Sequence, residues 1–157
     1  MNIDLQEVNG DFIDMLTSLR DNGVSFLVVG AYALAAHGVP RATGDIDILV
    51  EPTATNAANV FRALAQFGAP VSAHGVTAKD FEKANAVYQI GLPPCRIDLL
   101  TSISGVDFQQ ANADAKVGHI GPCEVRFIGR EALITNKRAT GRMKDLADVE
   151  LLERLKG

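Results

Sequence analysis

The sequence predicts an α/β fold (α+β in the broader sense), with a mixed β-sheet of about four to five strands, flanking helices and a helical C-terminus. Three observations predict this class. Short apolar runs rich in β-branched residues alternate with helical patterns, no linker or internal repeat interrupts the chain, and its 157 residues suit one domain. We therefore expect residues 1–157 to form a single domain.

The individual elements follow from hydrophobic spacing and from capping residues. Helices are expected at 11–19, 31–37 and 53–67, and in two segments from 130 onward that separate near residues 140–141. The last helix is expected to turn Met143, Leu146, Val149, Leu152 and Leu155 inward. Strands are expected at 24–29, 45–50, 86–90, 96–100 and 124–128.

Composition and charge exclude several classes of protein. The chain is 47% hydrophobic and 22% charged, which excludes a disordered or collagen-like protein. No apolar stretch is long enough to span a membrane, no secretory signal is evident, and Cys95 and Cys123 lack a CxxC spacing. These features predict a cytoplasmic protein without a membrane partner.

The net charge of −4 argues against a surface built for general nucleic-acid binding. One segment differs, because residues 126–144 hold six basic side chains and a single acid. That segment could hold a polyanionic ligand, or it could be the solvated face of a helix.

Three aspartates are the main candidates for chemistry. Asp45 and Asp47 lie two apart on an expected strand, so their side chains leave the same face. Asp98 is flanked by Ile97 and Leu99 much as Asp47 is flanked by isoleucines. If the two strands are neighbours, three carboxylates meet, which suits a pair of divalent cations. The alternatives are solvated acids at a strand end and an ion pair between Asp98 and Arg96.

Gly30 and Ala31 join a buried strand to a helix. A glycine there allows a ligand to approach the backbone, and the first N–H groups of the helix favour an anion. The chain then passes through Arg41 and returns to Asp45. We expect a phosphate-binding turn beside the acids.

Residues 26–31, 41–48 and 96–100 together resemble the DNA polymerase β-type nucleotidyltransferase superfamily. Its pattern is a hydrophobic strand that ends in Gly-Ser or Gly-Gly, a DxD strand, and a later single Asp between apolar residues. Residues 133–148 resemble the C-terminal helices of small, stand-alone bacterial members, including abortive-infection toxins.

The resemblance implies the nucleotidyltransferase fold and a role for each candidate. Asp45, Asp47 and Asp98 would bind a pair of Mg²⁺ ions, with Mn²⁺ as a substitute, and Asp98 would also accept the proton of the attacking hydroxyl. Gly30 and Ala31 would form the phosphate loop. Lys137 would contact the triphosphate, helped by Arg41 and Lys144.

The implied function is metal-dependent transfer of a nucleoside monophosphate from an NTP to a hydroxyl acceptor. The acceptor would be a small molecule, or a tRNA or protein if the enzyme is of the toxin type, with an antitoxin or RNA as partner. One residue departs from the pattern, since Ala31 stands where the family usually has Ser or Gly. The alternatives are a catalytically silent module that binds nucleotide or a partner protein, and a phosphohydrolase that uses the same acids on water.

Overall fold

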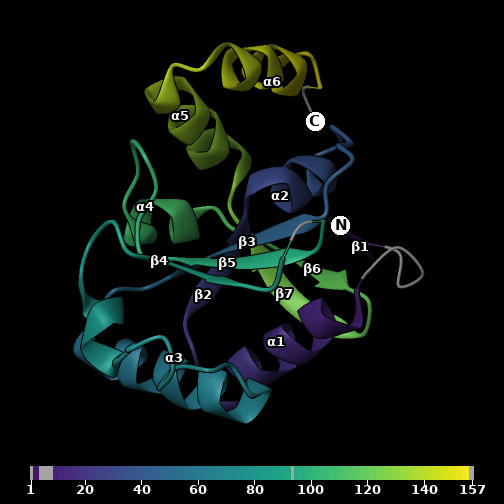
Figure 1. Ribbon diagram of the computed structural model, residues 1–157. Helices are drawn as coiled ribbons and strands as arrows, with labels where there is room; N and C mark the ends of the chain where they lie inside the picture. The colour runs from purple at the N-terminus through teal and green to yellow at the C-terminus, as the bar shows by residue number, and fades with distance from the viewer. Residues whose placement is uncertain (1, 4–8, 93, 156–157) are drawn as a thin grey trace.

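The computed structural model describes residues 2–3, 9–92 and 94–155. A seven-stranded mixed sheet lies at its centre, in the order β1-β6-β7-β2-β3-β5-β4 (Figure 1). The strands are β1 (Asn2–Ile3), β2 (Phe26–Val29), β3 (Asp45–Val50), β4 (Val87–Ile90), β5 (Arg96–Leu100), β6 (Lys116–Ile120) and β7 (Cys123–Phe127). The helices are α1 (Gly10–Asp21), α2 (Gly30–Ala36), α3 (Ala54–Phe67), α4 (Phe108–Ala113), α5 (Arg130–Thr140) and α6 (Met143–Arg154), with a 3-10 turn η2 (Ala78–Glu82).

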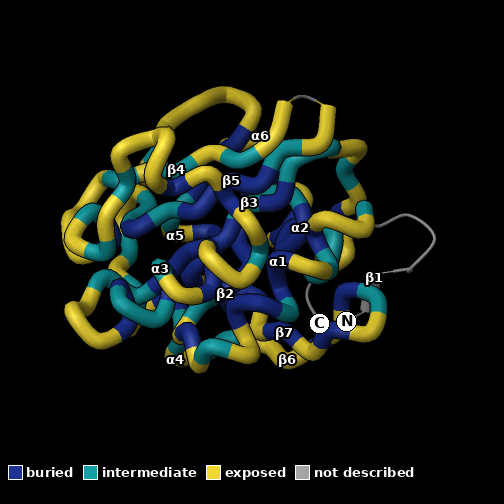
Figure 2. The backbone as a smooth tube through the Cα atoms, turned by 60° about the horizontal axis from the view of Figure 1, so that its bottom comes forward, coloured by how far each residue is buried: buried dark blue, intermediate teal, exposed yellow. Residues whose placement is uncertain are grey.

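The helices form layers on the two sides of the sheet. In Figure 1, α1 and α3 lie below the sheet, whereas α2, α5 and α6 lie above it. The apolar residues of β3, Ile46 and Ile48, are completely buried and alternate with Asp45 and Asp47, so the two acids leave by the opposite face. Each of the central strands β2, β3 and β5 has a run of three buried residues (Figure 2).

Capping residues mark the ends of several helices. The side chain of Thr53 accepts a hydrogen bond from the backbone N–H of Asn56 at the start of α3, and Gly68 ends that helix in the left-handed conformation. Gly141 ends α5 in the same conformation and separates it from α6. The two C-terminal helices are therefore confirmed, with the break at the expected place.

The mixed α/β fold is confirmed, but the estimate of about four to five strands is too low. β6 was missed because its exposed residues, including Val117 and His119, alternate with Gly118 and leave almost no apolar stripe. It pairs antiparallel with β7, and its neighbour β1 adds a short parallel edge. α4 was also missed, although Asp107 and Gln110 form a reciprocal capping box that marks its start.

The inward face of α6 differs from the expectation. Val149 and Leu152 are buried as expected, but Met143 is 87% exposed, and Leu146 and Leu155 are also exposed. Asp145 and Asp148 take the inward positions instead. Two carboxylates can replace apolar residues there because basic side chains neutralise them, as described below.

Within the part of the chain that the structure describes, no helix has the length and hydropathy needed to cross a membrane.

Candidate functional site

The strand registers bring two of the predicted acids side by side. β3 and β5 run parallel, with Asp47 opposite Asp98 and Asp45 opposite Arg96. Because paired residues in a sheet point to the same face, all four side chains leave the face that carries α2. Val29, the last residue of β2, lies opposite Asp47, so the row of acids begins where the Gly30 turn begins.

Burial and neighbouring acids disfavour the negative charge of Asp47. Burial raises the pKa of Asp47 to about 6, helped by the negative charge of Asp98 and a hydrogen bond shared with it. The charge of Asp45 acts in the same direction, and the nearby Arg96 guanidinium offsets only part of the effect. A cation bound beside Asp47 would therefore stabilise its carboxylate form.

Gly30 supports Asp47 directly from the start of α2. Its φ of +66° lies in the left-handed region that other residues avoid. A Cβ added there would lie well inside contact distance of the Asp47 Oδ2 atom, and 3.0 Å from its Cγ. The turn thus requires glycine for two independent reasons, and its backbone packs against the acid.

We expect Gly30→Ala to destabilise the protein by at least about 2 kcal/mol, since it combines backbone strain with a clash. It should also remove any activity that depends on the position of Asp47. Gly75→Ala is a matched control, because Gly75 has a φ of +68° but open space around it, and it should lose only about 1 kcal/mol. Equal urea midpoints for the two variants would contradict the clash.

A cavity of about 240 Å³ opens beside the acids and is lined by most of the predicted site residues. They come from β3, the α2 turn, the segment after α2 and the two C-terminal helices: Gly30, Ala31, Arg41, Asp45, Asp47, Lys137 and Lys144. Asp98 does not line this cavity, but its side chain shares a hydrogen bond with Asp47, which does. Arg142, Asp145 and Asp148 also line it, although the sequence did not predict them as site residues.

Lys137 is held in a buried network between α5 and α6. Its Nζ donates to Asp145 Oδ1 at 3.1 Å and to Asp148 Oδ2 at 3.0 Å, and the residue is only 8% exposed. Arg41 donates to the other oxygen of Asp148. The lysine expected to contact a triphosphate is thus paired with two acids at the wall of the cavity, whereas Lys144 is exposed.

Asp145 accepts side-chain hydrogen bonds from three residues of this network, and Asp148 from two. Burial alone would raise the pKa of Asp145, but hydrogen bonds from Thr140, Arg142 and Lys137, together with the charge of Lys137, lower it to about 2. Asp145 and Asp148 lie three residues apart in the sequence of α6, and this spacing indicates that they share one face of the helix. The sequence could not show that this face turns toward Lys137.

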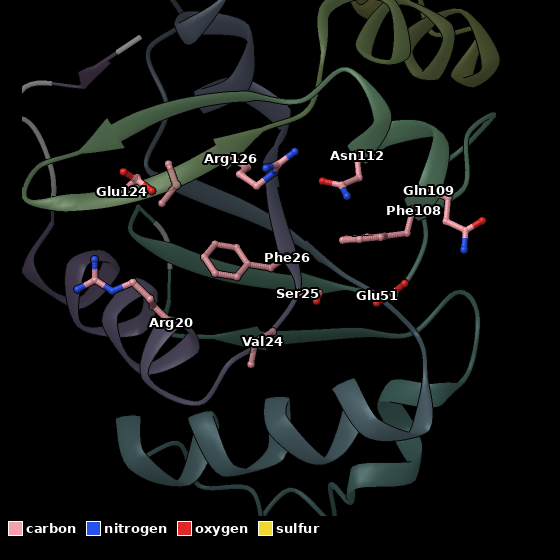
Figure 3. A pocket seen from close by; sticks show the side chains of 11 residues that line it. Arg20, Val24, Ser25, Phe26, Glu51, Phe108, Gln109, Asn112, Glu124 and Arg126 are labelled. Atoms are coloured by element: carbon pink, nitrogen blue, oxygen red, sulfur yellow. The ribbon is translucent and has the colours of Figure 1, made fainter.

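A larger cavity, of about 480 Å³, lies elsewhere. It is found at the opposite ends of β2 and β3, where Phe26, Phe108 and Arg126 surround it (Figure 3). It contains none of the predicted site residues. The acid row and the smaller cavity beside it form the candidate site on chemical grounds.

The carboxylates match Mg²⁺ in kind, because hard divalent cations prefer carboxylate oxygens. The raised pKa of Asp47 supports the match, since a cation would relieve the repulsion between neighbouring acids. Within the described residues, however, no group of three or more His, Cys, Asp or Glu side chains is already arranged around one ion position. Arg96 lies between Asp45 and Asp98 instead.

A row of strand carboxylates beside a strand–glycine–helix turn, on a mixed sheet, agrees with the nucleotidyltransferase resemblance noted in the sequence. Comparison with known families agrees. Residues 9–156 match the model of the family described as nucleotidyl transferase of unknown function (DUF2204), and the chain belongs to this family.

Two solved structures share the fold. A protein of Thermotoga maritima (TM1012), described as a candidate nucleotidyltransferase, aligns with a TM-score of 0.55 at 14% identity, covering 91% of this chain and 88% of its own. The lincosamide antibiotic adenylyltransferase LnuA, solved with lincomycin bound, aligns with a TM-score of 0.54 at 12% identity, covering 95% and 98%. No curated protein matches this chain.

Proposed function

We propose that the protein is a Mg²⁺-dependent nucleotidyltransferase that moves a nucleoside monophosphate from an NTP to a hydroxyl on a small acceptor molecule. The observation that carries this proposal is the pairing of Asp47 with Asp98 on neighbouring strands, next to the Gly30 turn. Membership in a nucleotidyl transferase family supports the reaction class.

In the proposed reaction, the acceptor oxygen forms a bond to the α-phosphorus while the bond from that phosphorus to the bridging oxygen breaks. Pyrophosphate leaves, and the carboxylate of Asp98 accepts the hydroxyl proton. Asp45, Asp47 and Asp98 would hold Mg²⁺, which supplies charge neutralisation at the phosphates and activates the hydroxyl when bound. Most of the rate would come from positioning, as in phosphoryl transfer generally.

The basic residues of the cavity would bind the triphosphate. Arg41, Lys137, Arg142 and Lys144 lie along its wall, and Asp145 and Asp148 hold the first three in place. Phosphate oxygens would compete for donors that are already ordered, which limits the entropy lost on binding. Backbone N–H groups of Gly30 and Ala31 would add contacts, without the hydroxyl that a serine would provide.

A small acceptor is favoured over a nucleic acid because the basic segment 126–144 is largely neutralised within the fold. Four of its six basic side chains form ion pairs with acids of the chain itself: Arg130 with Glu131, Lys137 with Asp145 and Asp148, Arg138 with Glu153, and Arg142 with Asp145. A nucleic acid requires an excess of basic groups over an extended surface, and the paired acids reduce that excess here. The similarity to LnuA, whose structure contains a small antibiotic, is consistent with this choice.

The test is to incubate the purified protein with α-labelled NTPs, Mg²⁺ and a cell extract, and to find which fraction becomes labelled while pyrophosphate release is measured. We expect label in a compound of low mass, and no transfer by Asp98→Asn. Label in RNA or protein, with a reaction slowed strongly by salt, would instead identify a macromolecular acceptor. Nucleotide binding by calorimetry without pyrophosphate release would support the silent module, for which Ala31 is the argument.

A further inference from the structure

The guanidinium of Arg96 bridges two of the three acids. Its Nε donates to Asp98 Oδ1 at 2.8 Å and one terminal nitrogen donates to Asp98 Oδ2 at 3.2 Å, so the pair is bidentate. The same terminal nitrogen lies 3.3 Å from Asp45 Oδ2. The backbone N–H of Arg96 also donates to Asp45 Oδ1, at 3.3 Å.

This contact differs from an ordinary surface ion pair in its location. The side chain of Asp98 is only 10% exposed, and the side chains of Arg96 and Asp45 are 28% and 35% exposed. A bidentate, partly desolvated pair is stronger than a fully exposed one. Within the described residues, no other basic side chain forms an ion pair with Asp45 or Asp98.

Arg96 also uses the oxygens that a metal would need. Both oxygens of Asp98 accept hydrogen bonds from its guanidinium, and one oxygen of Asp45 forms an ion pair with it. A divalent cation and a guanidinium cannot occupy one space between two carboxylates, since both the volume and the positive charges conflict.

We propose that Arg96 is an internal counter-ion that holds Asp45 and Asp98 in the metal-free protein and that a divalent cation displaces when it binds. This inference rests on the proposed function. Arg96 then keeps the acids close together before the metal arrives, and it lowers the affinity for metal because its own bonds must first break. It is a positioning residue for the metal site, and the strength of its own contacts with the acids limits the affinity for metal.

The test compares Mn²⁺ binding, by the EPR signal of the free ion, and Mg²⁺ binding, by calorimetry, in wild type, Arg96→Gln, Arg96→Lys and Arg154→Gln. Arg154 is a matched control, because it also pairs with one acid, Glu150, but on the exposed surface. We expect Arg96→Gln to bind Mn²⁺ about tenfold or more tightly, since a unit charge beside two ligands is removed. Arg96→Lys, which keeps the charge but loses the planar fork, should fall between, and Arg154→Gln should match wild type.

Two further readouts separate displacement from a purely structural ion pair. In EDTA, Arg96→Gln should melt below wild type, and saturating Mg²⁺ should close most of that gap. In wild type, the NMR signal of the Arg96 Nε–H should shift or broaden during a Mg²⁺ titration, whereas that of Arg154 should not.

The outcomes distinguish this inference from the proposed function. If wild type binds metal but Arg96→Gln has the same affinity and the Arg96 signal does not move, the displacement idea is wrong and the enzyme proposal stands. If no form binds Mn²⁺ or Mg²⁺ at millimolar concentration, metal-dependent transfer itself fails. If Arg96→Gln does not fold, Arg96→Lys and the wild-type titration still decide the question.

Discussion

Replacing Asp47 by Asn is expected to abolish nucleotidyl transfer and, at the same time, to stabilise the metal-free protein at pH 7. The carboxylate of Asp47 is needed to hold the metal in the proposed reaction, yet the metal-free fold disfavours its charge because of burial and the neighbouring Asp98. An amide has nearly the same shape, carries no charge and can donate a hydrogen bond to Asp98. Activity and stability should therefore change in opposite directions.

The magnitude and sign follow from the shifted pKa. A rise from 3.8 to about 6 means that the folded protein binds more protons than the unfolded chain in this range. The contribution of Asp47 to the stability of the metal-free wild type should then fall as the pH rises from about 4 to about 6, by about 3 kcal/mol at most. Asp47→Asn has no carboxyl group to titrate at this position. Its gain in the free energy of unfolding over wild type should therefore be largest above pH 6 and vanish near pH 4.

The measurement is urea unfolding in EDTA at several pH values, together with the transfer assay. Asp45→Asn is a matched control on the same strand: it should also lose activity, but it breaks a partly exposed ion pair with Arg96 and should gain no stability. A variant of Asp47 that transfers nucleotide normally would refute the proposed role. An Asp47→Asn protein less stable than wild type at every pH would refute the electrostatic explanation.

The sequence allowed the acid row to be predicted because its information is local. The alternation of Asp45 and Asp47 with isoleucines fixes the face of one strand, and the matching environment of Asp98 suggests a neighbouring strand. β3 and β5 are indeed neighbours, and their parallel register, which the sequence did not predict, places Asp47 opposite Asp98. From the sequence, an Arg96 ion pair and a cluster of three acids were alternatives. The structure contains the ion pair and places Asp47 opposite Asp98, but its described residues form no metal-binding group of three acids.

The rest depends on contacts that local patterns do not encode. The apolar spacing of α6 suggested that Met143 and Leu146 turn inward, but the helix instead buries the face that carries Asp145 and Asp148. Burial of these two acids is favourable only because Lys137 and Arg41, which lie on other parts of the chain, form ion pairs with them. A buried charge can be predicted only when its partner is known, and these partners are distant in the sequence.

The fold around the cavity should depend strongly on Lys137. Replacing it by Met keeps most of the length of the side chain but leaves Asp145 and Asp148, which are 3% and 1% exposed, without their shared cation. Each acid retains another donor, Arg142 for Asp145 and Arg41 for Asp148. The expected loss is therefore about 3 kcal/mol, the lower end of the range for breaking a buried pair.

Lys144→Met provides the comparison, because Lys144 lines the same cavity but is exposed and forms no ion pair within the described chain. Its urea midpoint should equal that of wild type, while its KM for NTP should rise if it contacts the triphosphate. In a double-mutant cycle, the variant with both Lys137→Met and Asp148→Asn should be more stable than Lys137→Met alone. The second change removes a charge that the first left without its shared lysine. Equal stability of Lys137→Met and Lys144→Met would contradict the buried network, because only a solvated lysine can lose its charge without consequence for the fold.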